Sequence, residues 1–202
     1  FYLKQDRSVE WVEITTDPRS EPREGSLPDG SIIQLNASTS LRYPKKFNRK
    51  QREVHLDGEA YFSVASRTRR PFIVHTDRQR VNVLGTEFNL LAYSSDPYTV
   101  TTLVNGRVRL ELYGNHDSIQ NEVSMSPKQQ VYYDKGTMRA TLLEVDPTEY
   151  TSWLNGVYSF KDAPLEQIAN RLEKVHGVNL IIQGDTQSTN IALFSNICIA
   201  TA

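Results

Sequence analysis

The chain has 202 residues, 38% apolar and 23% charged, with a formal net charge of −1. This length supports a buried core without disulfides or metal, because a chain of about 150 residues already buries roughly 70% of its unfolded surface. The near-zero net charge excludes a global electrostatic field that would steer the chain to nucleic acid. The sequence contains no run of about 18 apolar residues, so no membrane span is predicted. Cys198 is the single cysteine, which excludes an intrachain disulfide.

Residues 1–26 are interpreted as an N-terminal linker with one short strand. Trp11-Val12-Glu13-Ile14 alternates as a strand does, and Pro18 and Pro22 interrupt the residues after this strand. From residue 27 to 145 the period of the apolar residues is two, which predicts an all-β domain. The signal Pro28-Asp29-Gly30 predicts a type I turn at its start.

Two glycines mark changes in strand phase. A two-residue hairpin at Asp57-Gly58 would place Val54 and Phe62 on opposite faces, so we expect a corner or bulge there. At Gly85 the apolar phase also reverses, and we expect a bend or bulge, which glycine permits sterically.

Asn105-Gly106 is the strongest hairpin signal in the chain, because both residues tolerate the positive φ of a type I′ turn. This turn would pair Leu103 with Val108 and Thr101 with Leu110.

Strands with corners predict a mainly β fold, either a twisted antiparallel β-sandwich or a solenoid-like stack. A jelly roll or cupin-like barrel is the competing architecture.

Residues 146–156 are a connector, and residues 157–202 are predicted to be a small, partial βαβ domain of α+β type. Residues 157–160 alternate as a short strand, Asp162 is expected to cap a helix, and Gly177 is expected to end it. The helix has one apolar stripe, formed by Leu165, Ile168, Ala169, Leu172 and Val175. Residues 178–182 then predict a second strand, parallel to the first.

No arrangement of residues predicts catalysis, a cofactor or a metal. The histidines, at positions 55, 75, 116 and 176, show no metal-ligand spacing and are expected to be surface or partly buried residues. Asp57 and Glu59 could suggest a glycosidase pair, but turn formation explains Asp57 without catalysis. We therefore expect a protein that is not an enzyme.

One stretch is rich in basic residues. Between Arg42 and Arg80 there are eleven Lys and Arg against four Asp and Glu. Lys45, Lys46 and Arg49 lie among turn residues, so they form either a solvated loop or a basic face for an acidic protein or anionic lipid. Nucleic acid is disfavoured, because aromatic residues are not interleaved with these bases.

Six separated phrases, in this order and spacing, resemble the periplasmic region of the FecR family of bacterial anti-sigma factors. They are Leu27-Pro28-Asp29-Gly30-Ser31, Leu35-Asn36-Ala37-Ser38, Leu56-Asp57-Gly58-Glu59-Ala60-Tyr61-Phe62, Pro71-Phe72-Ile73-Val74, Val83-Leu84-Gly85-Thr86-Glu87-Phe88-Asn89 and Leu103-Val104-Asn105-Gly106-Arg107-Val108. Residues 157–202 are similar to part of the short N-terminal domain of secretins and TonB-dependent receptors. They depart from that pattern after Ser195.

The resemblance implies a sensor on the periplasmic face of the inner membrane. A cytoplasmic segment outside this chain would hold an extracytoplasmic-function sigma factor, and one membrane helix would tether the full-length protein. The region represented here would be a soluble fragment that receives a signal from the signalling domain of a TonB-dependent outer-membrane transducer. It would work through surfaces alone.

Two surfaces are candidates for that contact. The first is a strand edge at Val178, Leu180 and Ile182, which could pair with a strand of the partner; the second is the basic face. The main alternative function is a carbohydrate-binding β-sandwich, a lectin or adhesin, with a groove formed by Tyr93, Tyr98, Tyr132 and Tyr133. A cupin-like enzyme would need His55 or His75 to converge with carboxylates inside a barrel.

Overall fold

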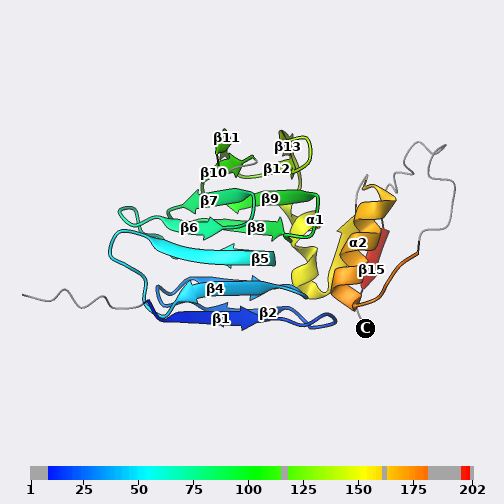
Figure 1. Cartoon of the computed structure of the whole chain (residues 1–202), viewed down its shortest axis with the longest axis horizontal. Coiled ribbons are helices and arrows are strands. Elements are labelled where there is room, and N and C mark those ends of the chain that lie inside the picture. Colours follow the sequence, from blue (N-terminus) through cyan, green and yellow to red (C-terminus); the bar gives the residue numbers. More distant parts are fainter. Residues whose placement is uncertain (1–8, 115–117, 161–162, 182–196, 201–202) are drawn as a thin grey trace, which may run out of the picture.

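The computed structural model describes residues 9–114, 118–160 and 163–181 and the backbone of 197–200. Thirteen strands form two sheets that share β5 (Arg52–Ser63) (Figure 1). Sheet A has the order β11 (Ile119–Met125), β10 (Val108–Tyr113), β7 (Gln79–Val83), β6 (Phe72–His75), β5, β4 (Ser40–Pro44) and β1 (Trp11–Thr15). Sheet B has the order β13 (Arg139–Glu144), β12 (Gln129–Asp134), β9 (Tyr98–Asn105), β8 (Glu87–Ala92), β5, β3 (Ile32–Leu35) and β2 (Arg23–Ser26).

The core lies between the two sheets. Alternate side chains of both point inward, and the phenyl rings of Phe62 and Phe88 stack there with centroids 5.0 Å apart. Neighbouring strands are antiparallel except β5 and β6, which are parallel. The predicted mainly β fold is confirmed, in the form of a sandwich whose sheets are joined along one strand.

Strand β5 changes sheet at Gly58. Leu56 pairs with β4 of sheet A, whereas Gly58 pairs with β8 of sheet B. Gly58 has φ +134°, and a Cβ atom at this position would clash with the side chain of Thr39. The corner predicted at Asp57-Gly58 is confirmed, and it needs glycine for both conformation and space.

Two further crossings between the sheets were the subject of sequence predictions. Gly85 lies in the bend between β7 and β8, as predicted, and a Cβ atom there would meet the backbone of Ser66 at 2.6 Å. The hairpin predicted at Asn105-Gly106 is wrong. β9 ends at Asn105 in sheet B, and Gly106, with φ +94°, leads the chain into sheet A.

Leu103 accordingly pairs with Phe88, and Val108 pairs with Met125. Gly106 provides a positive φ in either case, but the packing of the two sheets decides whether β9 and β10 pair with each other. Thr86 Oγ1 donates a hydrogen bond of 2.9 Å to the Arg107 carbonyl, so the two crossings are linked to each other.

The N-terminal residues belong to the sandwich. The predicted strand at residues 11–14 exists as β1, paired with β4. Residues 23–26, interpreted as linker from the sequence, form β2, which pairs with β3 through the turn at Pro28-Asp29-Gly30. The Gly30 N–H donates to the Leu27 carbonyl at 3.0 Å, which closes that turn.

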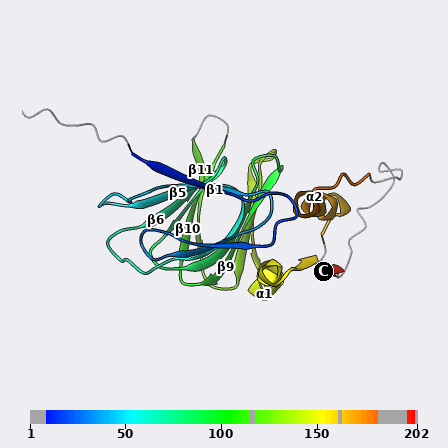
Figure 2. The ribbon, with the colours of Figure 1, turned by 90° about the horizontal axis from the view of Figure 1, so that it is seen from below.

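The C-terminal segment, residues 146–181, packs against the sandwich (Figure 2). Its elements are α1 (Pro147–Thr151), the 3₁₀ helix η1 (Ser152–Asn155), β14 (Val157–Phe160) and α2 (Leu165–His176). Gly177, with φ +57°, ends α2 as predicted, and Ile168 and Val175 of the apolar stripe are buried. The N-cap of α2 is Pro164, so the cap predicted at Asp162, which lies outside the described residues, is wrong.

The predicted βαβ unit is not formed. Residues 178–181 are not a strand, and β14 pairs antiparallel with β15 (Ile197–Ala200). Apolar residues at 178–181 suggested a strand, but their side chains are exposed. In the described part of the chain, no helix has the length and hydropathy required to cross a membrane.

Candidate functional site: a polar docking interface and its cavity

The outer face of sheet B carries polar side chains in register. Strand pairing aligns Tyr61, Asn89, Thr102, Gln130 and Leu143 in one row across β5, β8, β9, β12 and β13. The next row consists of Glu59, Leu91, Val100, Tyr132 and Thr141. An outer sheet face normally meets water, but here the C-terminal segment contacts Glu59 and Asn89, which are buried.

Glu59 is the centre of a buried hydrogen-bond network in this face. Its side chain is 1% exposed. Asn36 Nδ2 donates to Oε2 at 2.5 Å and Asn89 Nδ2 donates to Oε1 at 2.9 Å. A buried carboxylate needs such donors, because the loss of its hydration is otherwise too costly. Gly58, one residue earlier, places Glu59 where β5 enters sheet B.

Two aromatic residues of the C-terminal segment complete the hydrogen bonding of the asparagines. Trp153 Nε1 of η1 donates to Asn89 Oδ1 at 3.1 Å, and the Tyr158 hydroxyl of β14 donates to Asn36 Oδ1 at 2.8 Å. Trp153 is 1% exposed and Tyr158 is 4% exposed. The connector predicted from the sequence is therefore an anchored element, held by a buried indole.

Arg171 of α2 forms an ion pair with Glu59 through NH2 and Oε2. Its guanidinium lies over the Tyr158 ring, 5.6 Å from the centroid. Burial is the largest single influence on Arg171 and opposes its charged form, but Glu59, together with Tyr93 and Tyr98, raises the pKa of the guanidinium. Buried NH1 has no hydrogen-bond partner among the described residues. The pair is thus well connected on the Glu59 side and incompletely satisfied on the Arg171 side.

The far end of α2 has a second set of contacts. Lys174 Nζ pairs with Asp96 Oδ1 at 2.5 Å, and the Asp96 carboxylate also accepts from Asn170 Nδ2 at 3.2 Å. At the helix C-terminus, the Arg19 N–H donates to the Val175 carbonyl at 2.8 Å and its Nε donates to the His176 carbonyl at 2.7 Å. Carbonyls that a helix end leaves unpaired are thereby satisfied by the N-terminal part of the chain.

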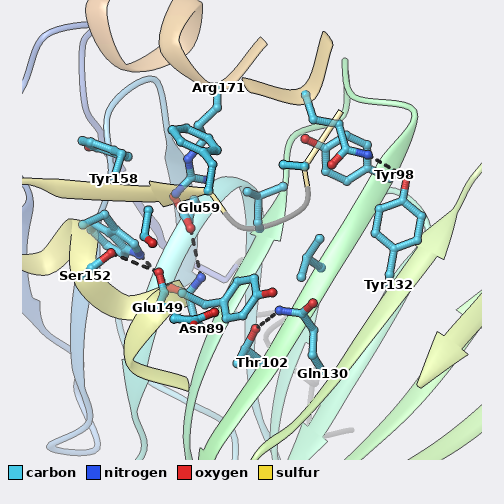
Figure 3. A pocket seen from close by; sticks show the side chains of 18 of the residues that line it. Glu59, Asn89, Tyr98, Thr102, Gln130, Tyr132, Glu149, Ser152, Tyr158 and Arg171 are labelled. Atoms are coloured by element: carbon cyan, nitrogen blue, oxygen red, sulfur yellow. Dashed lines mark hydrogen bonds and ion pairs between the residues drawn. The ribbon is translucent and has the colours of Figure 1, made fainter. Parts of the chain in front are cut away.

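A cavity of about 320 Å³ remains between the segment and the sheet (Figure 3). Glu59, Arg171 and Tyr158 lie on one side of it, and Tyr98 and Tyr132 lie on the other, with Thr102 and Gln130 between them. The rings of Tyr98 and Tyr132 stack with centroids 5.3 Å apart. Leu143, 44% exposed, extends the lining to the outermost strand of the sheet.

The basic residues predicted as a surface are exposed, and one of them forms an ion pair. Lys45 Nζ pairs with Glu10 Oε1 at 2.8 Å, and both side chains are largely exposed to solvent. Lys46 and Arg49 are exposed in the loop between β4 and β5. Arg52, from the same stretch, is buried and binds Asp29 Oδ2 at 2.6 Å, so it belongs to the fold. The basic face at Lys45, Lys46 and Arg49 stays a prediction.

Val178 and Leu180 are 39% and 42% exposed, and Ile182 lies outside the described residues. The Leu180 N–H donates to Glu173 Oε1 at 2.8 Å. The strand edge that suggested pairing here is absent from residues 178–181, although the exposed apolar side chains leave this segment a candidate contact surface.

The groove of four tyrosines expected for a lectin is not formed. Tyr93 and Tyr133 are buried, with 4% and 0% exposure, and only Tyr98 and Tyr132 line the cavity. Burial raises the pKa of Tyr98 far above its ordinary value, so its hydroxyl stays protonated. Two stacked rings beneath a docked segment do not make the open aromatic surface that a lectin needs.

Two histidines are adjacent in space despite their sequence separation. The parallel pairing of β5 with β6 places His55 beside His75, with ring centroids 4.8 Å apart. They lie outside the core, and Glu53 Oε1 is 3.4 Å from His75 Nε2. Among the described residues, no group of three metal-ligating side chains surrounds them or any other point.

Comparison with known proteins identifies the family. The sequence model of the FecR protein family matches residues 13–109. Two crystal structures of a candidate anti-sigma factor from Parabacteroides distasonis ATCC 8503, at 2.50 Å and 1.65 Å resolution, share the fold with TM-scores of 0.76. They are 29% and 30% identical, and the alignments cover 83% and 82% of this chain and 75% of each relative. No curated protein matches.

The docking interface extends beyond the matched sequence region. Asn36, Glu59 and Asn89 lie within residues 13–109, whereas Trp153 and Arg171 lie after them. The similarity to the two solved structures, at up to 30% identity, includes most of the chain. The chain therefore belongs to the FecR family of anti-sigma factors.

Proposed function

We propose that this chain is the periplasmic sensor region of a membrane-tethered anti-sigma factor. It receives a signal from the signalling domain of a TonB-dependent outer-membrane transducer. The signal then controls an extracytoplasmic-function sigma factor that is held by a cytoplasmic segment outside this chain. Membership of the FecR family supports the anti-sigma role, and the protein works by binding, with no catalytic residue.

One observation carries the sensing part of the proposal: the C-terminal segment is held on the sandwich by the Arg171–Glu59 ion pair. A buried ion pair often contributes little net stability, because desolvation offsets its attraction. The segment also contributes Trp153, Tyr158 and Val175 to a small buried apolar cluster, so the ion pair specifies its position more than it adds to its stability. Partner binding that favours an undocked segment needs only a differential affinity of a few kcal/mol to shift the population.

The test has two parts. The first titrates the 202-residue chain with the purified signalling domain of a transducer encoded beside it, using calorimetry. The second measures a sigma-dependent reporter in cells that carry the full-length protein as wild type, Arg171→Met or Arg109→Met. We expect Arg171→Met to change the ratio of induced to basal activity, and Arg109→Met, at the exposed Arg109–Glu122 pair, to leave it unchanged.

Immunoblots must show equal amounts of the three proteins. A measurable affinity together with a shifted ratio supports the proposal. The sensing role of the docked segment is contradicted if the signalling domain does not bind at millimolar concentration. It is also contradicted if the ratio of induced to basal activity is the same for Arg171→Met and the wild type.

A further inference from the structure

The cavity beneath the C-terminal segment is lined by a tyrosine whose hydroxyl has no hydrogen-bond partner among the described residues. This tyrosine is Tyr98 of β9, which is 6% exposed and stacks its ring on Tyr132. Three other buried tyrosines, Tyr93, Tyr133 and Tyr158, each donate to a protein acceptor at 2.8 or 2.9 Å. A buried tyrosine hydroxyl normally has such a partner, so the Tyr98 hydroxyl is available to a group from outside the chain.

Two glutamine side chains beside Tyr98 add further polar groups to the cavity wall. Gln130, which is 4% exposed, donates from Nε2 to Thr102 Oγ1 at 2.8 Å, and its Oε1 accepts no hydrogen bond from a described residue (Figure 3). Gln167 Nε2 of α2 donates to the Tyr132 hydroxyl at 3.3 Å, so the Tyr132 O–H group can itself donate. Hydroxyl donors and an amide acceptor therefore lie in the same wall.

Apolar side chains line the cavity from both of its sides. On the sheet, strand pairing places Leu91 beside Val100, in the row that continues to Tyr132. On the C-terminal segment, Trp153 and Phe160 face the same cavity. Apolar walls with a few polar groups are typical of small-molecule sites, and a volume of about 320 Å³ is at the lower end of their range. A molecule of one or two rings fits this space.

The charged side chains in the described lining do not favour an ionic ligand. Glu59 and Arg171 form an ion pair with each other, and Glu149 has an interaction of its own. Burial raises the pKa of Tyr98 far above its ordinary value, so its hydroxyl stays a neutral donor. An ion that entered the cavity would lose its hydration without gaining an unpaired opposite charge. An uncharged ligand avoids this cost.

We infer that this cavity is a binding site for an uncharged small molecule of one or two rings. The ring system lies against the apolar walls, a carbonyl or hydroxyl oxygen accepts from the Tyr98 hydroxyl, and an N–H or O–H group donates to Gln130 Oε1. The inference concerns the cavity alone, and it stands whether or not the chain receives a signal from a transducer.

The probe is oxindole, a neutral fused bicycle with one carbonyl and one N–H group. Indane has the same ring skeleton without either group. An NMR titration of the whole chain follows the backbone amides that border the cavity, such as those of Val100 and Tyr132. We expect oxindole to bind with a Kd below about 1 mM. Aminoindane, a cation, and indane carboxylate, an anion, should bind more weakly than oxindole.

The decisive variant is Tyr98→Phe, which removes the hydroxyl and keeps the ring that stacks on Tyr132. It should weaken oxindole binding about fivefold or more, because the carbonyl loses its donor, and change indane binding less than about twofold. Tyr133→Phe is the matched control: its hydroxyl binds the Tyr113 carbonyl outside the cavity lining, so both affinities should stay unchanged. Val100→Phe fills the cavity and should weaken both ligands about tenfold. Circular dichroism and a urea titration establish that each variant folds.

Selective weakening of oxindole by Tyr98→Phe, with the Tyr133→Phe protein unchanged, supports the inference. Three results would overturn it: no binding of oxindole at millimolar concentration, an equal effect of Tyr98→Phe on oxindole and indane, and tighter binding of either charged analogue. Amide shifts confined to residues away from the cavity would place the probe elsewhere and would equally contradict the inference.

Discussion

Trp153 Nε1 lies 3.1 Å from Asn89 Oδ1, and this hydrogen bond joins η1 to the sandwich beneath the C-terminal segment. Asn89 uses its other polar atom, Nδ2, to bind Glu59. A single asparagine therefore connects the anchor of the segment to the buried carboxylate. Because the chain also contains the exposed Trp11, a Trp11→Phe background makes Trp153 a specific reporter of docking.

Replacing Trp153 should loosen the segment. Trp153→Phe keeps most of the apolar contact but leaves Asn89 Oδ1 buried without its donor, which costs about 1–3 kcal/mol. Hydrogen exchange of the α2 amides should accelerate by a corresponding factor. In the Trp11→Phe protein, Trp153 should be protected from acrylamide. Free access of the quencher to Trp153 would contradict the docked structure.

Removing one member of the Glu59–Arg171 pair should destabilise the protein more than removing both members. Glu59→Gln presents an amide N–H₂ group to the donors that surround the carboxylate, and it leaves the buried guanidinium of Arg171 without its counter-charge. We expect the free energy of unfolding to fall by about 3–5 kcal/mol. In the double variant Glu59→Leu with Arg171→Met, apolar packing should recover part of that loss. Urea unfolding of Glu59→Leu, of Arg171→Met and of the double variant measures the coupling. Strictly additive losses would show that the two side chains do not interact.

The histidine pair predicts a pH dependence of stability. Burial lowers the pKa of both His55 and His75 from the ordinary value of 6.5. A positive neighbour lowers each pKa further: His75 acts on His55, and Arg80 acts on His75. Glu53 opposes both shifts. The unfolded chain then binds more protons than the folded chain just below pH 6.5. Stability from this source is present above that pH and is lost as the pH falls through the folded pKa values.

The urea midpoint should therefore decrease between about pH 7.5 and pH 5. A His55→Gln, His75→Gln variant should show a smaller decrease, because no proton can bind at either site. An unchanged slope in the double variant would assign the pH dependence to other groups.

Two glycines with positive φ form a matched pair for the corner in β5. Gly58→Ala combines backbone strain of about 1–2 kcal/mol with a clash against Thr39, whereas Gly30→Ala at φ +87° meets no atom within 4 Å. We expect Gly58→Ala to destabilise the protein by at least about 2 kcal/mol more than Gly30→Ala. Thermal unfolding of the two variants gives the difference. Equal melting temperatures would mean that space at Gly58 is not limiting.

Charge reversal tests the basic face. Lys45→Glu, Lys46→Glu and Arg49→Glu together should leave the fold intact, because these side chains are exposed, and should weaken binding of an acidic partner or of anionic vesicles at low salt. Vesicle co-sedimentation at two salt concentrations measures this effect. Binding that is independent of both charge and salt would leave these residues a solvated loop.

The sequence predicted the strands and their corners better than the partners of those strands. The phase reversals at Gly58 and Gly85 are local properties, so alternation revealed them, and both sites are changes of sheet. The error at Asn105-Gly106 has a different origin. Turn chemistry provides the positive φ at Gly106, but whether β9 then pairs with β10 is decided by contacts far away in the chain.

The interface around Glu59 could not be predicted for the same reason. In the sequence Glu59 is distinguished only by its neighbour Asp57, and its partners Asn36, Asn89 and Arg171 are 23 to 112 residues away. One signal was present: Glu59 and Asn89 occupy strand positions that alternate with core residues, on a face that also carries apolar Leu91 and Val100. A mixed polar and apolar outer face indicates a covered sheet, although it does not identify the cover.

The cap that Arg19 forms on the end of α2 has a consequence for the order of folding. It joins residues separated by 157 positions, and contacts between such distant residues form slowly because closing so long a loop is entropically costly. The sheets, by contrast, are built largely from neighbouring strands. We therefore expect the sandwich to assemble first and α2 to be added last. The first element to open under native conditions should then also be α2, long before the barrier to global unfolding is reached.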